Sequence, residues 1–244
     1  MGNEANHHCV DGSAQSALHV ACDADNALSD LMMPVILRRL KVEAHGLALT
    51  EFAFALPLVL VLLLYGLETA NLGLATLRVH QIAATAADNA ARVRDSISED
   101  DVNEVLVGGK TVGERIDFAT RGRIILSDVL TNGLTGTNAG QKILWQRCAG
   151  ALNVPQSQPL YGIEGKGATD NSLQAMGKPG RQIAPSPTSA MVFAEVTYRY
   201  KPVVSATLLG TPILRSEASF IVRERQSETL TTSPATPISR CSTF

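Results

Sequence analysis

A single carboxylate, Glu51, lies inside the most apolar stretch of the chain and calls for a chemical explanation. It follows Gly46 by five positions, and the sixteen residues from Phe52 to Leu67 carry no formal charge. A carboxylate in hydrocarbon is costly unless it gains a partner, so such residues mark functional or interfacial positions. Two explanations stay open: Glu51 reaches the headgroup layer, or its charge serves a function.

The element that carries Glu51 is predicted to be a membrane-spanning helix over residues 47–67. This stretch of 21 residues contains no other formal charge, and about 20 apolar residues suffice for a helix to cross a bilayer. No small-residue cleavage site closes the run, which favours an anchor over a secretory signal. Positive charge beside a first span stays cytoplasmic, so the C-terminal part is expected outside the cytoplasm. The basic residues that precede the span are Arg38, Arg39 and Lys41.

Two cysteines beyond the span, Cys148 and Cys241, are predicted to form a disulfide. Both would lie in an oxidising compartment if the chain has the orientation given above. Cys148 closes a predicted strand and Cys241 lies close to the C-terminus, so the bond would tie the tail to the sheet. Sequence does not fix connectivity, and free or differently paired thiols remain the alternative.

The other candidates for chemistry are weak, and we predict no catalytic, cofactor-binding or metal site. His80 is the only histidine beyond the span and is expected to be solvated or interfacial. Residues 108–111 lack the strand and the glycine spacing of a phosphate loop. Trp145 is predicted to lie in the core. One group near the N-terminus fits no zinc-binding spacing: His7, His8, Cys9, His19 and Cys22.

The overall charge argues against a nucleic-acid-binding protein, and the N-terminal leader leaves the start of translation open. The chain has 21 basic and 23 acidic residues, a net charge of −2, which gives no electrostatic basis for binding nucleic acid. Residues 1–46 form a leader without a sustained apolar period. Translation from Met33 would shorten this leader to fourteen residues, and the start among Met1, Met32 and Met33 stays open.

The junction Gly46-Leu47-Ala48-Leu49-Thr50-Glu51-Phe52 resembles the N-terminus of type IV pilin-like proteins. In those proteins a dedicated peptidase cuts after the glycine, and glutamate occupies the fifth mature position. With Pro57, the leucine-rich run and Gly66-Leu67-Glu68, the segment from Leu47 to about Val93 resembles the TadE/TadG family of pseudopilins. These are minor components of bacterial tight-adherence (Flp) pilus systems. Residues 143–148, 161–162, 192–198 and 222–225 are less specifically similar to later blocks of some members, and the long acidic leader departs from the family's short basic one.

This resemblance implies a non-enzymatic, single-pass protein of the bacterial inner membrane, with a periplasmic domain, that acts by assembly. Cleavage after Gly46 would expose Leu47, and Glu51 would pair with the new N-terminus of a neighbouring subunit. The implied partners are the prepilin peptidase, a sister TadE/TadG-like pseudopilin, the major Flp pilin, the inner-membrane assembly platform and the lipid bilayer. The rival interpretation is an uncleaved bitopic protein whose periplasmic domain binds a ligand or an envelope component.

Two helical segments are predicted after the span. Small and apolar residues recur every three or four positions from Leu72 to Ile97, so the membrane helix is expected to continue as an amphipathic helix to about Arg94. A short helix is predicted to begin at an N-cap on Ser98, to run to about Leu106 and to end at Gly108-Gly109.

Four strands are predicted beyond these helices. Residues 123–130 and 142–148 flank a turn-rich loop and predict a hairpin. Residues 192–201 and 214–222 alternate in polarity and are expected to pair antiparallel, with one face on the helix. Residues 150–188 are predicted to form an exposed loop, and Arg223-Glu224-Arg225 a solvated strand edge.

The predicted fold class is therefore α+β, a long N-terminal helix packed on a small antiparallel sheet, as in pilin-like subunits. The expected organisation is a cleaved leader, the span, the periplasmic continuation of the helix, an α+β domain and an irregular tail. The corresponding ranges are 1–46, 47–67, 68–97, 98–226 and 227–244.

Overall fold

A computed structural model describes residues 44–243, with the side chains of 46–242. The predicted leader, with its histidines, cysteines and basic residues, lies almost wholly outside the described residues. The first described element is helix α2, Ala44–Arg92, which runs for 49 residues and contains Pro57. The chain divides within α2 into two units, one ending at Leu62 and one spanning Leu63–Phe244.

The described part of the first unit is the apolar beginning of α2. It is rich in leucine, alanine and valine, and every side chain from Gly46 to Leu62 is exposed within the described chain. The helix Gly46–Arg92 is long and apolar enough, by length and composition, to cross a membrane.

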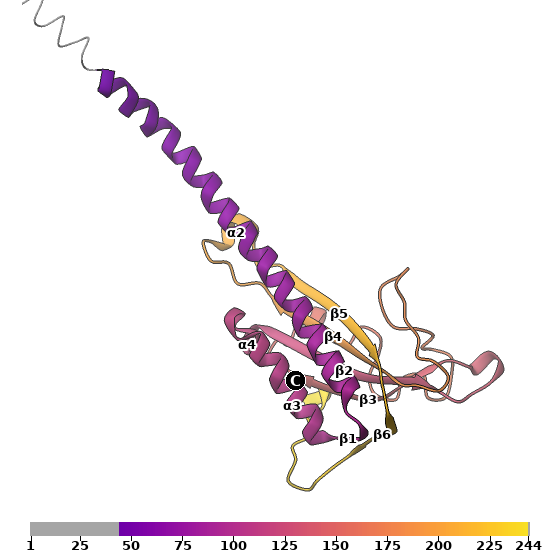
Figure 1. The fold of residues 1–244 in the computed structure, drawn as a ribbon. Coiled ribbons are helices and arrows are strands. Elements are labelled where there is room, and N and C mark those ends of the chain that lie inside the picture. Colours follow the sequence, from indigo (N-terminus) through magenta and orange to yellow (C-terminus); the bar gives the residue numbers. More distant parts are fainter. Residues whose placement is uncertain (1–43, 244) are drawn as a thin grey trace, which may run out of the picture. The chain divides into compact units, whose positions relative to one another are not determined.

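The second unit is built on a four-stranded antiparallel sheet of order β3-β2-β4-β5 (Figure 1). The sheet confirms the predicted hairpin, β2 with β3, and the predicted pairing of β4 with β5. A register shift at Asp128/Val129 interrupts the hairpin. The strands are β2 Gly122–Thr131, β3 Gln141–Ala149, β4 Met191–Arg199 and β5 Ile213–Ile221.

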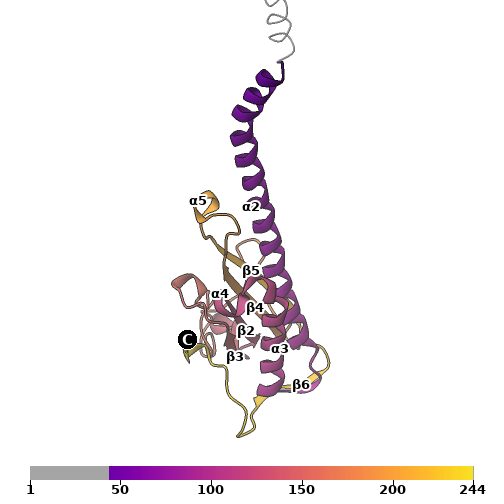
Figure 2. The same ribbon diagram turned by 90° about the vertical axis from the view of Figure 1, so that its left-hand side faces the viewer.

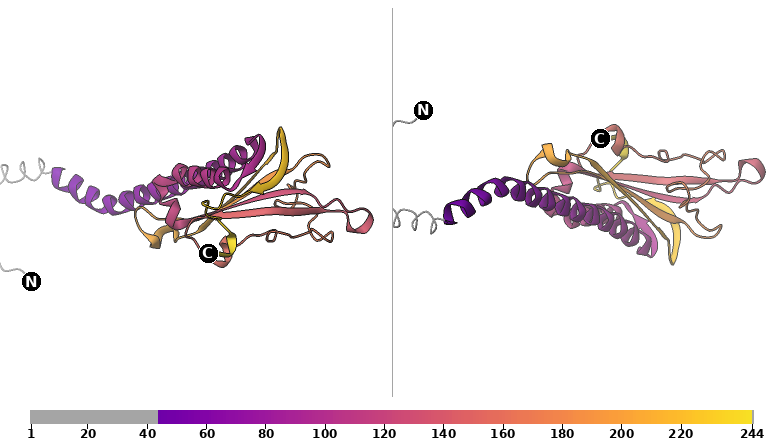
Figure 3. Two further views of the ribbon diagram at one scale, coloured as in Figure 1. Left: turned by 90° about the horizontal axis from the view of Figure 1, so that it is seen from below. Right: turned by 90° about the horizontal axis from the view of Figure 1, so that it is seen from above.

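Helices cover one face of this sheet (Figure 3). The buried stripe of α2 consists largely of alanine, so the helix backbone approaches the strands closely. Trp145 lies in this core with 2% of its surface exposed, as predicted. The main contributors are Ala75, Val79, Ile82, Ala83, Ala86 and Ala90 of α2, with Ile124, Leu126, Ala194, Val196 and Tyr198 of the sheet.

Helix α3, Glu99–Val112, is longer than predicted. Its start is as expected, because Ser98 and Asp101 form a capping box. The prediction that Gly108-Gly109 ends the helix is wrong. A Cβ atom on Gly109 would lie 2.6 Å from Ile124 Cδ1, so the glycine serves close helix–sheet contact, and packing outweighs its low helix propensity.

A second, two-stranded parallel sheet joins β1, Asp95–Ser98, to β6, Arg225–Thr231. The prediction of an irregular tail is therefore wrong for residues 227–231. The prediction that the helix continues over 68–97 is wrong for its last residues, because α2 ends at Arg92 and β1 begins at Asp95. The interpretation of Arg225 as part of a solvated edge is also wrong, since its side chain is fully buried. It binds the carbonyl oxygens of Ala90 and Val93 and the carboxylate of Glu228.

The face of the sheet away from α2 is covered by the long β3–β4 connection. Residues 150–188 lack regular strands, as predicted, but the prediction that they are exposed is wrong for Leu173 and Met176, which are buried against the sheet. A second core forms there from Val129, Ile143, Leu173, Met176, Met191 and Phe193. The short elements are η1 Glu114–Ile116, α4 Phe118–Arg121, η2 Gly136–Asn138, η3 Pro155–Ser157, α5 Ala206–Leu209 and η4 Cys241–Thr243.

Candidate functional site

The structure places the predicted processing residues in the first turns of α2, which begins at Ala44. Thr50 Oγ1 donates a hydrogen bond of 2.8 Å to the Leu47 carbonyl, within the helix. Leu47 is 69% exposed and Phe52 is 63% exposed, and Gly46 and Glu51 are also exposed in the described chain. The motif residues are thus presented outward on a helix.

An apolar surface of α2 follows the processing residues directly in the sequence. All side chains from Phe52 to Leu67 are exposed within the described chain. Burial of one leucine side chain is worth about 1.5–3 kcal/mol, so exposing such a series to water would be strongly unfavourable. This part of α2 therefore needs an apolar environment, which lipid or other apolar helices can supply.

The residue after the apolar run, Glu68, is fully buried, and three donors bind its carboxylate. Tyr200 Oη donates to Glu68 Oε1 at 2.5 Å, and the Val203 and Val204 amides donate to Oε1 and Oε2 at 3.2 and 2.7 Å. Asn71 Nδ2 donates to Tyr200 Oη at 2.7 Å, which orients the hydroxyl. Glu68 thus attaches α2 to the turn that leads from β4 into α5. Figure 2 shows this turn and α5 near α2.

The same contacts determine the protonation states of Glu68 and Tyr200. The hydrogen bond from Tyr200, followed by that from the Val204 amide, lowers the pKa of Glu68 below its ordinary 4.5. Burial and the bond to the carboxylate raise the pKa of Tyr200 to about 12. The carboxylate is therefore ionised and the phenol neutral at neutral pH.

We expect the stabilising contribution of the ionised Glu68 carboxylate to be lost in acid. A carboxyl whose folded pKa is lowered stabilises the fold above its unfolded pKa, and this contribution disappears as the pH falls through the folded value. Glu68→Gln should therefore destabilise the protein at pH 7, and the difference from wild type should shrink below pH 4.5. Unfolding at several pH values measures this, with Glu104→Gln, on α3, as the control. A difference that stays constant with pH would contradict the assignment.

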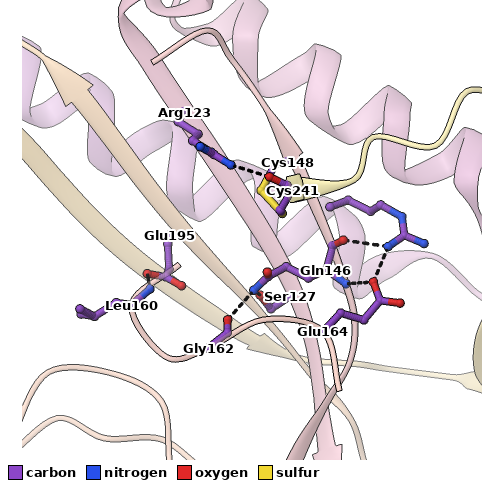
Figure 4. The surroundings of a disulfide bond; sticks show 10 residues. Arg123, Ser127, Gln146, Cys148, Leu160, Gly162, Glu164, Glu195 and Cys241 are labelled. Atoms are coloured by element: carbon purple, nitrogen blue, oxygen red, sulfur yellow. Dashed lines mark hydrogen bonds and ion pairs between the residues drawn. A yellow bond between two sulfur atoms is a disulfide. The ribbon is translucent and has the colours of Figure 1, made fainter. Parts of the chain in front are cut away.

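The predicted disulfide is present: Cys148 at the end of β3 is bonded to Cys241, 93 residues later. The neighbouring backbone supports it, because the Cys148 amide donates to the Ser239 carbonyl at 2.8 Å. Arg123 Nη2 of β2 donates to the Cys241 carbonyl at 3.1 Å (Figure 4). The covalent bond and these two hydrogen bonds therefore hold the end of the tail, around residues 239–241, on the sheet.

A buried ion pair holds α3 to β3. Arg147 Nη2 lies 2.5 Å from Glu99 Oε1, and the two side chains are 6% and 1% exposed. Arg147 Nε also donates to both oxygens of this carboxylate, and Nη1 reaches Glu164 Oε2 at 2.8 Å. A cation shared by two carboxylates fixes the helix, the edge strand and the β3–β4 connection to one another.

Another buried carboxylate, Glu195 of β4, lies on the face of the sheet away from α2. Burial raises its pKa to about 7, although Arg215 of β5 and the Leu160 amide bind it. Tyr161 Oη donates to the adjacent Glu217 at 3.0 Å. These groups fix the β3–β4 connection over the sheet through Glu195 Oε2 and Glu217 Oε2, whereas Glu195 Oε1 is buried without a hydrogen-bond partner among the described residues.

The remaining candidates for chemistry among the described residues are a metal-binding cluster, His80 and a surface hollow. No group of three or more His, Cys, Asp or Glu side chains there could hold a metal ion. His80 is exposed and its Nδ1 lies 2.7 Å from Ser216 Oγ, without a carboxylate in that contact to orient it as a base. A surface hollow of about 500 Å³ beside Cys241 has a mixed lining of Gln146, Gln158, Pro159, Ile163, Glu164, Arg240 and Ser242.

Sequence reasoning missed the Glu68, Glu99 and Arg147 contacts. Only the charge of Glu68 directly after an apolar run could have drawn attention to the first. Glu99 and Arg147 bind each other across 48 residues of sequence, and no local pattern connects them. Comparisons with protein-family models, curated proteins and solved structures found no match to this chain.

Proposed function

We propose that this protein is a minor pseudopilin, of the TadE/TadG kind, of a tight-adherence (Flp) pilus system. It acts by assembly in the bacterial inner membrane, with its sheet domain in the periplasm. The prepilin peptidase cuts after Gly46, and the mature chain begins at Leu47. Its partners are a sister pseudopilin, the major Flp pilin and the assembly platform.

The observation that carries this proposal is the exposed apolar surface of α2 between Phe52 and Leu67. Beyond it, an alanine-rich stripe of the helix, from Ala75 onward, packs on the sheet of the same chain. The apolar surface has no use within the described chain, so it is available to lipid and to other pilin-type helices. Van der Waals packing between close helices drives such association in a bilayer.

Glu51 gives this association its register. Its exposed carboxylate lies on the helix surface five positions after Gly46, where a helix in lipid tolerates a charge chiefly if it is paired. The α-amino group that processing creates at Leu47 of a neighbouring subunit is a cation at the same end of the helix. Pairing these two charges aligns adjacent helices.

Two features of the sheet domain suit a periplasmic location. The Cys148–Cys241 disulfide belongs in an oxidising compartment. Glu68, the first residue after the apolar run, binds the turn before α5. The sheet domain is therefore attached to α2 at the point where the helix would leave the bilayer.

We expect Glu51→Ala to impair pilus assembly while leaving the protein in the membrane. The substitution removes the charge partner and increases the apolar character of the span, so insertion is preserved. Surface pilus yield and co-purification with the sister pseudopilin should fall at least about tenfold, the equivalent of about 1.4 kcal/mol in helix association.

Thr50→Ala is the matched control, because it changes the neighbouring residue and keeps the carboxylate. It should assemble like wild type. Normal pilus yield and normal co-purification with Glu51→Ala would refute the assembly role and favour the uncleaved bitopic protein.

A further inference from the structure

Strand β5 has an open edge. It is the last strand of the order β3-β2-β4-β5 and is paired with β4 alone among the described residues (Figure 1). The pairing extends from Ile213 to Ile221 without a register shift. A strand in this position offers a row of N–H and C=O groups to another extended chain.

The hydrogen bonds at the two ends of β5 identify which peptide groups point outward. The Val222 amide donates to Ala190 O, and the Tyr200 amide donates to Pro212 O, at 2.9 Å each. Hydrogen-bonded pairs of an antiparallel ladder recur at every second residue, so the even-numbered residues of β5 face β4. The outward peptide groups belong to Ile213, Arg215, Glu217, Ser219 and Ile221, and no hydrogen bond among the described residues reaches them.

Protein edges usually carry a feature that prevents pairing, such as a proline, a bulge or an outward lysine. Strand β5 contains no proline, no lysine and no bulge. Its charged residues, Arg215 and Glu217, are engaged by Glu195 and Tyr161 on the sheet face. The edge is therefore open to a partner strand.

A hollow of about 440 Å³ follows this edge. His80 and Ala84 of α2 line one side, and Lys178 and Arg181 of the β3–β4 connection line the other. Lys178 and Arg181 are exposed, and neither forms a salt bridge with a described residue. An added strand would lie about 4.8 Å from β5, within reach of both cations, so carboxylates on that strand would be favoured.

A second copy of the chain fits this edge poorly. Two β5 strands paired antiparallel about a twofold axis would bring Lys178 and Arg181 of both copies toward the same centre, since they border residues 216–220. Like charges at close range oppose such pairing.

We propose that the outer edge of β5 binds an extended, carboxylate-bearing segment of a different protein by strand addition. The main-chain bonds supply affinity, and Lys178 and Arg181 select acidic side chains. This inference depends on the sheet domain alone. It can fail while the pseudopilin proposal stands, and the reverse is also true.

The test is peptide selection on the full chain in detergent micelles, using a phage-displayed library of random twelve-residue peptides. We expect enrichment of β-branched residues alternating with Asp or Glu. An enriched peptide, labelled with a fluorophore, should bind Ser219→Pro about tenfold more weakly than Ser219→Ala. The proline removes one outward donor, and a tenfold loss corresponds to about one backbone hydrogen bond.

A second measurement avoids any folding defect of the proline variant. N-methylation of alternate peptide amides should weaken binding to the wild-type chain by a similar factor, and Lys178→Gln/Arg181→Gln should remove the preference for carboxylates. The proposal is overturned by failure to enrich any peptide or by equal binding to the two Ser219 variants. Enrichment without acidic residues, or self-association through β5, would overturn it as well.

Discussion

Replacing Arg147 with methionine is expected to destabilise the sheet domain by about 3–5 kcal/mol, because it leaves the carboxylate of Glu99 buried without its partner. Glu99 is 1% exposed and receives three hydrogen-bond contacts from this guanidinium. Glu164 is 44% exposed, so it loses little when the arginine is removed. Unfolding by urea, followed through the fluorescence of the single tryptophan, Trp145, measures the change.

The double substitution Glu99→Leu/Arg147→Met separates loss of the pair from loss of packing. Apolar residues of similar volume can replace a buried ion pair at little cost, so most of the stability should return. Arg199→Met, an exposed position at the end of β4, is the control and should change stability by less than about 0.5 kcal/mol. Equal destabilisation by the single and double variants would contradict the role given to the pair.

Loss of the Cys148–Cys241 disulfide is expected to cost up to about 4–5 kcal/mol. The bond joins residues 93 apart, and a closed loop of this size removes that much chain entropy from the unfolded state in the loop-closure model. The variant Cys148→Ala/Cys241→Ala should unfold at a lower urea concentration than the oxidised wild type. Hydrogen exchange should become faster in the tail around Ser239.

A reducing agent provides the matched comparison for this variant. Reduced wild type and the alanine pair should have similar stability, and the reductant should not affect the alanine pair. If full reduction leaves the urea midpoint of wild-type unfolding unchanged, the disulfide does not stabilise the fold.

The sequence predicted most of the regular elements because their periodic patterns are local. Alternation over 192–201 and 214–222 located β4 and β5. Steps of three and four residues predicted a helix to about Arg94, two residues beyond the end of α2 at Arg92. The disulfide followed from compartment and position. Each of these inferences used residues that are close together in the chain or of unmistakable chemistry.

The remaining features depend on contacts between distant segments. Gly109 looked like a helix stop because its proximity to Ile124 is a tertiary fact. Arg225 looked solvated because its acceptors, the carbonyl oxygens of Ala90 and Val93, belong to the end of α2. The buried position of Glu68 was not predicted because the amides that bind its carboxylate come from a turn 135 residues later.

N-terminal sequencing with intact-mass measurement tests the central claim most directly, on protein from membranes of cells with and without the prepilin peptidase. We predict a mature N-terminus at Leu47 that is absent in cells without the peptidase. A start at Met1 or Met33 in both strains would contradict the pseudopilin assignment and leave a membrane-anchored sheet domain with a different role.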